Sequence, residues 1–190
     1  MPRVLAFAAS LRKKSWNKKL VRVAAQGARE AGAEVTVLEL EDYPLPVYNA
    51  DDEAAHGLPE NVIRLKQIFR EHDAFLISCP EYNGGYPGMF KNLLDWLSRK
   101  TPGEERGLDA FSYKPVAVMA ATPGALGGNR MLATLRGLLL HLQMLVIPEV
   151  HGLGRAAEAF DEQGNLKDPK VEAAIKNLGR KVTEIAAKLR

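Results

Sequence analysis

Short apolar runs alternate along the chain with longer segments whose apolar residues recur three and four positions apart. The short runs are unbroken and rich in small and β-branched residues, which is typical of parallel strands buried on both faces. They predict five strands, at residues 4–9, 35–40, 74–79, 115–121 and 145–147. The segments with helical spacing predict helices over residues 20–31, 62–69, 90–96, 132–142 and 169–189.

This alternation predicts a doubly wound parallel sheet between two layers of helices, which is a three-layer α/β fold. The opening strand, helix and strand form a βαβ unit, and we expect the flavodoxin-like strand order 2-1-3-4-5. No repeat, low-complexity segment or linker interrupts the pattern, so we expect one domain over residues 1–190. Strands 1, 3 and 4 are neighbours in that order. The loops after them should therefore converge at the carboxyl edge of the sheet, where such folds bind ligands.

One long segment, Tyr43–Pro59, lies outside the pattern. It holds three prolines and several acidic residues, and we predict a surface loop. Loops of this length in compact domains are often functional.

Composition and charge narrow the classes of function. The 26 basic and 23 acidic residues are interleaved and leave a net charge of +3, which gives no reason to expect nucleic acid as a partner. The single cysteine, Cys79, excludes an internal disulfide and fits a reducing compartment. We see no signal peptide, and no apolar run approaches the roughly 18 residues of a membrane span. We therefore expect a cytoplasmic protein without membrane contact.

The loop after the first strand carries chemistry suited to phosphate. It places two hydroxyls, a guanidinium and an amide just before a helix, from Ser10, Ser15, Arg12 and Asn17. Free N–H groups at a helix N-terminus suit a phosphate, and an arginine can clamp its oxygens with two hydrogen bonds. The loop matches neither G-x-G-x-x-G nor the Walker motif G-x-x-x-x-G-K-[ST]. The alternative is that Ser15 only caps the helix and Arg12 is solvated.

The loop after the third strand is suited to a flat heterocycle. Its glycines let the backbone approach a ring closely, and Tyr82 or Tyr86 could lie against the face of that ring. From Pro80 to Trp96 the chain has every fixed position of the motif P-E-Y-N-x-x-x-P-G-x-x-K-N-x-x-D-W. In this motif the chain closely resembles the NADPH-dependent FMN reductase family, which includes flavodoxin-like quinone, chromate and azo-dye reductases.

Two further loops carry the same resemblance. The family's phosphate loop, G-S-x-R-x-x-S-x-N, corresponds to Ala9–Asn17, with Ala9 in place of glycine. Its third loop, a S-P-G or T-P-G followed by glycines, corresponds to Thr122–Gly128. The resemblance implies FMN as cofactor, with its phosphate held by Ser10, Arg12, Ser15 and Asn17. It implies that the isoalloxazine is lined, largely by backbone, at Pro80, Glu81, Tyr82, Asn83 and Gly84. Thr122 is expected near the ring or the ribityl chain. The segment Gly84–Tyr86 departs from the family, which often has serine or histidine there.

The resemblance also implies an activity. We expect NADPH or NADH to reduce FMN, and a quinone, azo compound, chromate or second flavin to take the electrons in a ping-pong order. The chemistry belongs to the flavin N5, so no catalytic side chain is expected. The first rival function is that of an electron carrier like flavodoxin, without NAD(P)H turnover of its own. A second is a flavin-free binding module on the same fold, and a third is an oxidoreductase dedicated to one metabolite.

Several residues have a structural interpretation beside the functional one. The resemblance implies a homodimer or homotetramer in which the helix around Trp96 lies at the interface, whereas a core role is the alternative. The apolar stretch Leu138–Leu142 could likewise lie at a subunit interface or in the buried core. Cys79 is expected to be a packed apolar side chain rather than a redox thiol. The histidines have no metal-like spacing, so no metal site is expected; they are His56, His72, His141 and His151.

Overall fold

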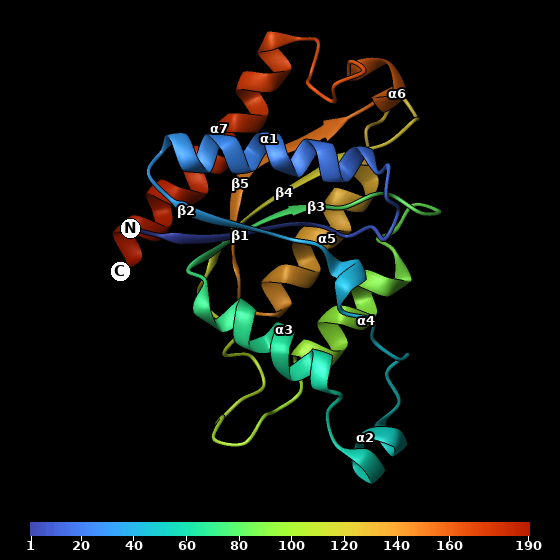
Figure 1. The fold of residues 1–190 in the computed structure, drawn as a ribbon, viewed down its shortest axis with the longest axis vertical. Helices are drawn as coiled ribbons and strands as arrows, with labels where there is room; N and C mark the ends of the chain where they lie inside the picture. The colour runs from blue at the N-terminus through green and yellow to red at the C-terminus, as the bar shows by residue number, and fades with distance from the viewer.

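The computed structural model describes residues 1–190 and contains a five-stranded parallel sheet with helices on both faces (Figure 1). The strands are β1 (Arg3–Ala8), β2 (Glu34–Leu38), β3 (Ala74–Ser78), β4 (Pro115–Ala121) and β5 (Leu145–Leu153). Their order across the sheet is β2-β1-β3-β4-β5, and every neighbouring pair is parallel. The predicted order and the three-layer arrangement are confirmed.

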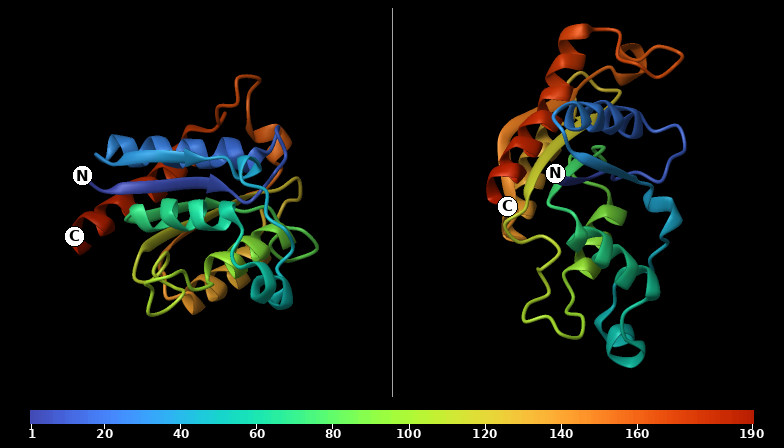
Figure 2. Two further views of the ribbon diagram at one scale, coloured as in Figure 1. Left: turned by 60° about the horizontal axis from the view of Figure 1, so that its bottom comes forward. Right: turned by 60° about the vertical axis from the view of Figure 1, so that its left-hand side comes forward.

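Two layers of helices cover the sheet (Figures 1 and 2). One layer is made of α1 (Trp16–Glu30) and α7 (Pro169–Leu189), and the other of α3 (Glu60–Glu71), α4 (Gly88–Leu97) and α5 (Asn129–His141). Three short elements complete the chain, and they are the 3-10 helix η1 (Leu40–Asp42), α2 (Ala50–His56) and α6 (Ala156–Ala159). None of the helices has the combined length and apolarity that crossing a bilayer requires.

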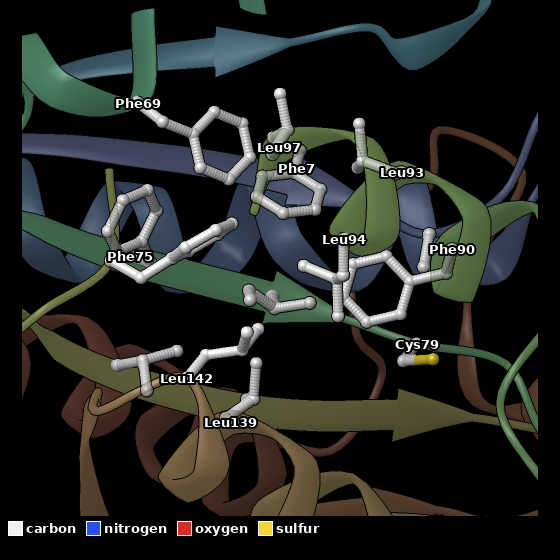
Figure 3. Packing of buried hydrophobic residues seen from close by; sticks show 14 of the residues in the cluster. Phe7, Phe69, Phe75, Cys79, Phe90, Leu93, Leu94, Leu97, Leu139 and Leu142 are labelled. Atoms are coloured by element: carbon white, nitrogen blue, oxygen red, sulfur yellow. The ribbon is translucent and has the colours of Figure 1, made fainter. Parts of the chain in front are cut away.

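Successive side chains of the central strands point to opposite faces of the sheet, so the core consists of two clusters, one on each face. In β1, Leu5 and Phe7 face α3, α4 and α5, whereas Ala6 and Ala8 face α1 and α7. The first side is filled by large rings, and Phe7 lies with its ring centroid 5.5 Å from that of Phe69 (Figure 3). The second side is rich in alanine. Small side chains on that side let α1 and α7 approach the sheet and each other closely.

Helix boundaries follow from local sequence signals. Ser15 caps α1 by accepting a hydrogen bond from the Asn17 N–H at 3.2 Å. At the other end of α1, Gly32 takes a left-handed conformation with φ +88°, and Ala33 N–H donates to the Ala28 carbonyl. This is the Schellman ending that the glycine predicted.

The prediction of a surface loop over Tyr43–Pro59 is wrong in part, because the helix α2 lies within it. Asn49 caps α2, and three acidic residues occupy its first turn, which favours a helix N-terminus. None of the residues of α2 is buried. A helix that buries no face needs no periodic apolar residues, and the sequence therefore shows no helical pattern here. In Figure 1, α2 extends away from the rest of the molecule.

The fifth strand is much longer than the three residues predicted. Pro148 stands in the middle of β5 and lacks the N–H that a ladder needs. The pairing with β4 shifts register between Val116 and Val118, and β5 is an edge strand, where proline is tolerated.

Candidate functional site

Three loops meet at the carboxyl edge of the central strands. They follow β1, β3 and β4, and together they enclose a hollow of about 60 Å³. That space is several times what a single water requires, so it accommodates a phosphate-sized group. Eight of the ten residues predicted for the site line this hollow, and they are Ser10, Arg12, Ser15, Asn17, Pro80, Glu81, Tyr82 and Thr122. Convergence of residues 112 positions apart (from Ser10 to Thr122) is what the strand order predicted.

Hydrogen-bond donors dominate the first loop of the hollow. The Ser10 and Ser15 hydroxyl oxygens each accept a backbone N–H, from Arg12 and Asn17, and each hydroxyl keeps its own proton to donate. The guanidinium of Arg12 lies 5.9 Å from the centroid of the Trp16 ring. No acidic residue occurs in the first turn of α1. The partial positive charge of the helix N-terminus is therefore left for a ligand.

Asn17 is placed differently from its three neighbours in the predicted set, since its side chain is tied into the sheet. Its Nδ2 donates to the Ala121 carbonyl at 2.9 Å, and its Oδ1 accepts from the Ala121 N–H at 2.9 Å and the Ser78 hydroxyl at 2.8 Å. The residue is 3% exposed. One amide proton of Asn17 remains for a phosphate. The rest of the side chain links α1 to β3 and β4.

The second loop forms a tight turn at its tip. Tyr82 N–H donates to the Gly85 carbonyl at 2.8 Å, and Gly85 N–H returns a bond to Tyr82 at 3.0 Å. Between them Asn83 and Gly84 both have positive φ, at 52° and 80°, which is the Asn-Gly pattern of a type I′ turn. Asn83 and Gly84 do not line the hollow. They directly follow Tyr82, which does line the hollow and is half exposed.

Glu81 lies in the wall of the hollow, and its negative charge is directed at the start of α5. One carboxylate oxygen accepts from Arg130 at 3.1 Å, and the other accepts from the Met131 N–H at 3.4 Å. The charge of Glu81 is therefore engaged by an arginine and a helix N-terminus. It opposes an anion in the hollow less than a free carboxylate would.

The third loop is held close to β5 by its backbone. Thr122 N–H donates to Leu153, and Ala156 N–H donates back to Thr122. At Gly127, φ is +61° and an added Cβ would lie 2.4 Å from the Gly152 carbonyl oxygen, so this position needs glycine. Sequence reasoning missed three lining residues, which are Trp16, Ala121 and Pro123. Trp16 and Pro123 lie within the first and third loop motifs, and their places in these motifs could have identified them as lining residues.

Comparison with known proteins assigns the family. Residues 2–158 match the family model described as NADPH-dependent FMN reductase. A quinone reductase of Pseudomonas putida is 38% identical over 167 residues, which cover 87% of this chain and 84% of that protein. The chain belongs to the NADPH-dependent FMN reductase family.

Solved structures agree with this family assignment. FerB of Paracoccus denitrificans, described as a flavoenzyme NAD(P)H:(acceptor) oxidoreductase, is 33% identical with a TM-score of 0.79, over 99% of this chain and 98% of that one. An archaeal flavodoxin is 10% identical with a TM-score of 0.62, over 97% of this chain and 99% of that one. The flavodoxin match shows the fold alone, and the fold is flavodoxin-like.

The residues of this FMN reductase fit the cofactor of its family. A flavin mononucleotide carries a dianionic phosphate, and the hollow offers hydroxyls, a guanidinium and a helix N-terminus with no unengaged carboxylate. Cys79, beneath the second loop, is fully buried, and burial raises the pKa of its thiol far above the ordinary value. Its role in the FMN reductase is apolar packing, as the sequence predicted.

Proposed function

We propose that the chain holds FMN across the three loops and acts as an NAD(P)H-dependent oxidoreductase on quinones. Azo compounds, chromate and free flavin are further acceptors in this proposal, and the order is ping-pong, with the oxidised nicotinamide leaving before the acceptor binds. Both NADPH and NADH serve as electron donors in this proposal. The observation that carries the proposal is the single hollow in which Ser10, Arg12 and Ser15 meet Tyr82 and Thr122.

Each loop has a defined part in the proposal. The Ser10 and Ser15 hydroxyls, Arg12 and one amide proton of Asn17 bind the phosphate. The half-exposed Tyr82 and the turn at Asn83 and Gly84 border the ring in this proposal, because Tyr82 lines the hollow and the turn directly follows it. FMN, when bound, supplies the hydride and electron transfer, while the protein supplies position and electrostatics.

Steady-state turnover tests the proposed function against its rivals. The purified protein is assayed for oxidation of NADPH and NADH with a benzoquinone, an azo dye, chromate and free FMN. Sustained turnover with the quinone is expected. A yellow protein that is reduced once but does not turn over would favour the electron carrier, and a colourless protein that does not take up FMN would favour the flavin-free module.

Arg12→Ala is expected to weaken FMN binding about tenfold or more. Loss of a charge-assisted hydrogen bond to phosphate typically costs about 1.5–3 kcal/mol, and the exposed position of Arg12 puts the effect at the lower end. The dissociation constant is measured by quenching of FMN fluorescence on the apoprotein. Lys13→Ala is the matched control, because Lys13 is exposed in the same loop but does not line the hollow. Equal affinities for the two variants would contradict the phosphate role of Arg12.

We further propose that α4 and α5 form a homodimer interface. Between these helices lies a hollow of about 440 Å³ whose apolar lining includes Leu94, Leu138 and Leu142. Apolar surface of this kind is typical of protein interfaces. Light scattering is expected to give a dimer, or a tetramer built from it, for the wild type and a smaller species for Leu138→Asp. A monomeric wild type would contradict this proposal.

A further inference from the structure

A second, apolar pocket lies beside the three-loop hollow. It has a volume of about 170 Å³ and is bordered by the loop after β1, by η1 and the loop that follows it, and by α4. We call it the side pocket. Six of its nine lining residues are hydrophobic, and the apolar side chains that matter below are Leu11, Leu40, Tyr43, Leu45, Met89 and Leu93.

Leu11 connects the side pocket with the proposed cofactor site. It stands between Ser10 and Arg12, both of which line the three-loop hollow, whereas Leu11 itself lines the side pocket. One short loop therefore forms part of the wall of both spaces. Leu11 is 50% exposed although it is a large apolar residue, so it is available to contact a ligand that extends from one space towards the other.

Two polar side chains of the side pocket, Glu41 and Asn92, are already engaged within the chain. Glu41 pairs with the buried Lys18 at 3.1 Å. Asn92 accepts from the Tyr48 N–H at 2.8 Å through Oδ1 and donates to the Pro46 carbonyl at 2.8 Å through Nδ2. A ligand in the side pocket would find leucine, methionine and proline side chains and no cationic lining residue.

The wall of the side pocket is fixed before any ligand arrives. Trp96 Nε1–H donates to the Pro46 carbonyl at 2.9 Å, and the Tyr48 ring stands edge-on to the Trp96 ring at 4.9 Å. Together with Asn92, these contacts hold the loop that carries Leu45 against α4. A preformed apolar pocket binds without the cost of ordering its own wall.

We propose that the side pocket binds the alkyl or prenyl side chain of a quinone whose head group is reduced at the neighbouring flavin site. This inference rests on the proposed function and names the substrate class as side-chain-bearing quinones. The volume of about 170 Å³ is many times what a single water requires, so one isoprenyl unit or a short alkyl chain fits within it. The phosphates of NAD(P)H do not suit the side pocket, because its only charged lining residue is the acidic Glu41.

A homologous series of quinones tests the proposal on the wild-type protein. Benzoquinones with side chains of zero to eight carbons are titrated into the FMN-loaded protein without NAD(P)H, and affinity is measured by calorimetry. Affinity is expected to rise about two- to fourfold with each added carbon, as for burial of a methylene, and to level off within the series once the side pocket is filled. The KM values for NADPH-driven reduction should fall in parallel. Affinity that does not change with side-chain length would overturn the proposal.

Two variants in one loop localise the effect. Leu45→Asn places a polar amide in the side pocket, and Val47→Asn makes the matched change two residues away at a position that is 83% exposed and outside the side pocket. Leu45→Asn is expected to lose most of the dependence on side-chain length while keeping the KM of unsubstituted benzoquinone within about twofold. Val47→Asn should behave as the wild type. Equal slopes in both variants would contradict the assignment.

The outcomes also separate this inference from the proposed function. If no quinone is turned over, the proposed function fails, while the calorimetric series still decides whether the side pocket binds alkyl chains. If quinones are turned over without dependence on side-chain length, the proposed function stands and the side pocket assignment fails. A change of molar mass in Leu45→Asn alone would show that a second copy of the chain covers the pocket, and this would also overturn the assignment.

Discussion

Gly179→Ala is expected to lose about 3 kcal/mol or more of unfolding free energy, although alanine is the better helix former. On propensity alone, the change would stabilise a helix by about 1 kcal/mol. The structure predicts the opposite sign, because a Cβ at Gly179 in α7 would lie 2.0 Å from the Ala24 carbonyl oxygen and 2.6 Å from the Ala28 nitrogen in α1. Both contacts are to backbone, so the helices themselves would have to separate.

Urea denaturation at a fixed FMN concentration measures this effect, since a bound cofactor adds to apparent stability. Gly137→Ala in α5 is the matched control, because nothing lies within 4 Å of a Cβ built at Gly137. The control is expected to gain up to about 1 kcal/mol. If both variants were stabilised alike, the close crossing of α1 and α7 would be wrong.

Asn17→Ala is expected to cost about 2–4 kcal/mol of unfolding free energy and to lower FMN affinity as well. Removing the side chain leaves the Ala121 N–H, the Ala121 carbonyl and the Ser78 hydroxyl without their partner in a buried setting. These bonds join α1 to the ends of β3 and β4, where the loops of the hollow begin. Their loss should therefore loosen the convergence of the loops as well as the core.

Asn17→Asp sharpens this test because it keeps the shape of the side chain. It retains an acceptor but loses the donor to the Ala121 carbonyl and sets a carboxylate oxygen against that carbonyl, so it too should be strongly destabilised. Asn177→Ala in α7 is the control, since Asn177 makes one long contact with Arg180 at 3.4 Å, and a change within about 0.5 kcal/mol is expected. Asn17→Ala with the stability of that control would refute the structural role.

The predicted elements agree best with the structure where a segment has one strong local reason for its conformation. β4 spans the predicted Pro115–Ala121 and α7 the predicted Pro169–Leu189. The first is a continuous apolar run buried at every position. The second has an apolar face of regular period, a capping Asp168 and a proline at its start. In both, the local pattern and the burial in the fold agree.

The predictions failed where the local pattern was weak or misleading. α2 buries nothing, so only its cap and acidic first turn signalled a helix. β5 continues through Pro148 and beyond the predicted residues 145–147, because an edge position and a register shift accommodate the proline. The phosphate interpretation of Asn17 rested on residue type. Only the folded chain shows that most of its hydrogen-bonding capacity is used on Ala121 and Ser78.

The sequence by itself determined the alternation of strands and helices and the family motifs, because these depend on periodicity and on residues that are close along the chain. The expected strand order and the meeting of the three loops at one edge followed from the fold class that this alternation implies. Only the tertiary structure decided which side chains remain free to bind a ligand and which are used in contacts within the fold. Asn17 and Ala121 are 104 positions apart, and the backbone contact between Gly179 and Ala24 joins two helices from opposite ends of the chain. The side pocket likewise draws its wall from three separate segments. Such contacts between distant residues leave no period in the sequence, and packing in three dimensions creates them.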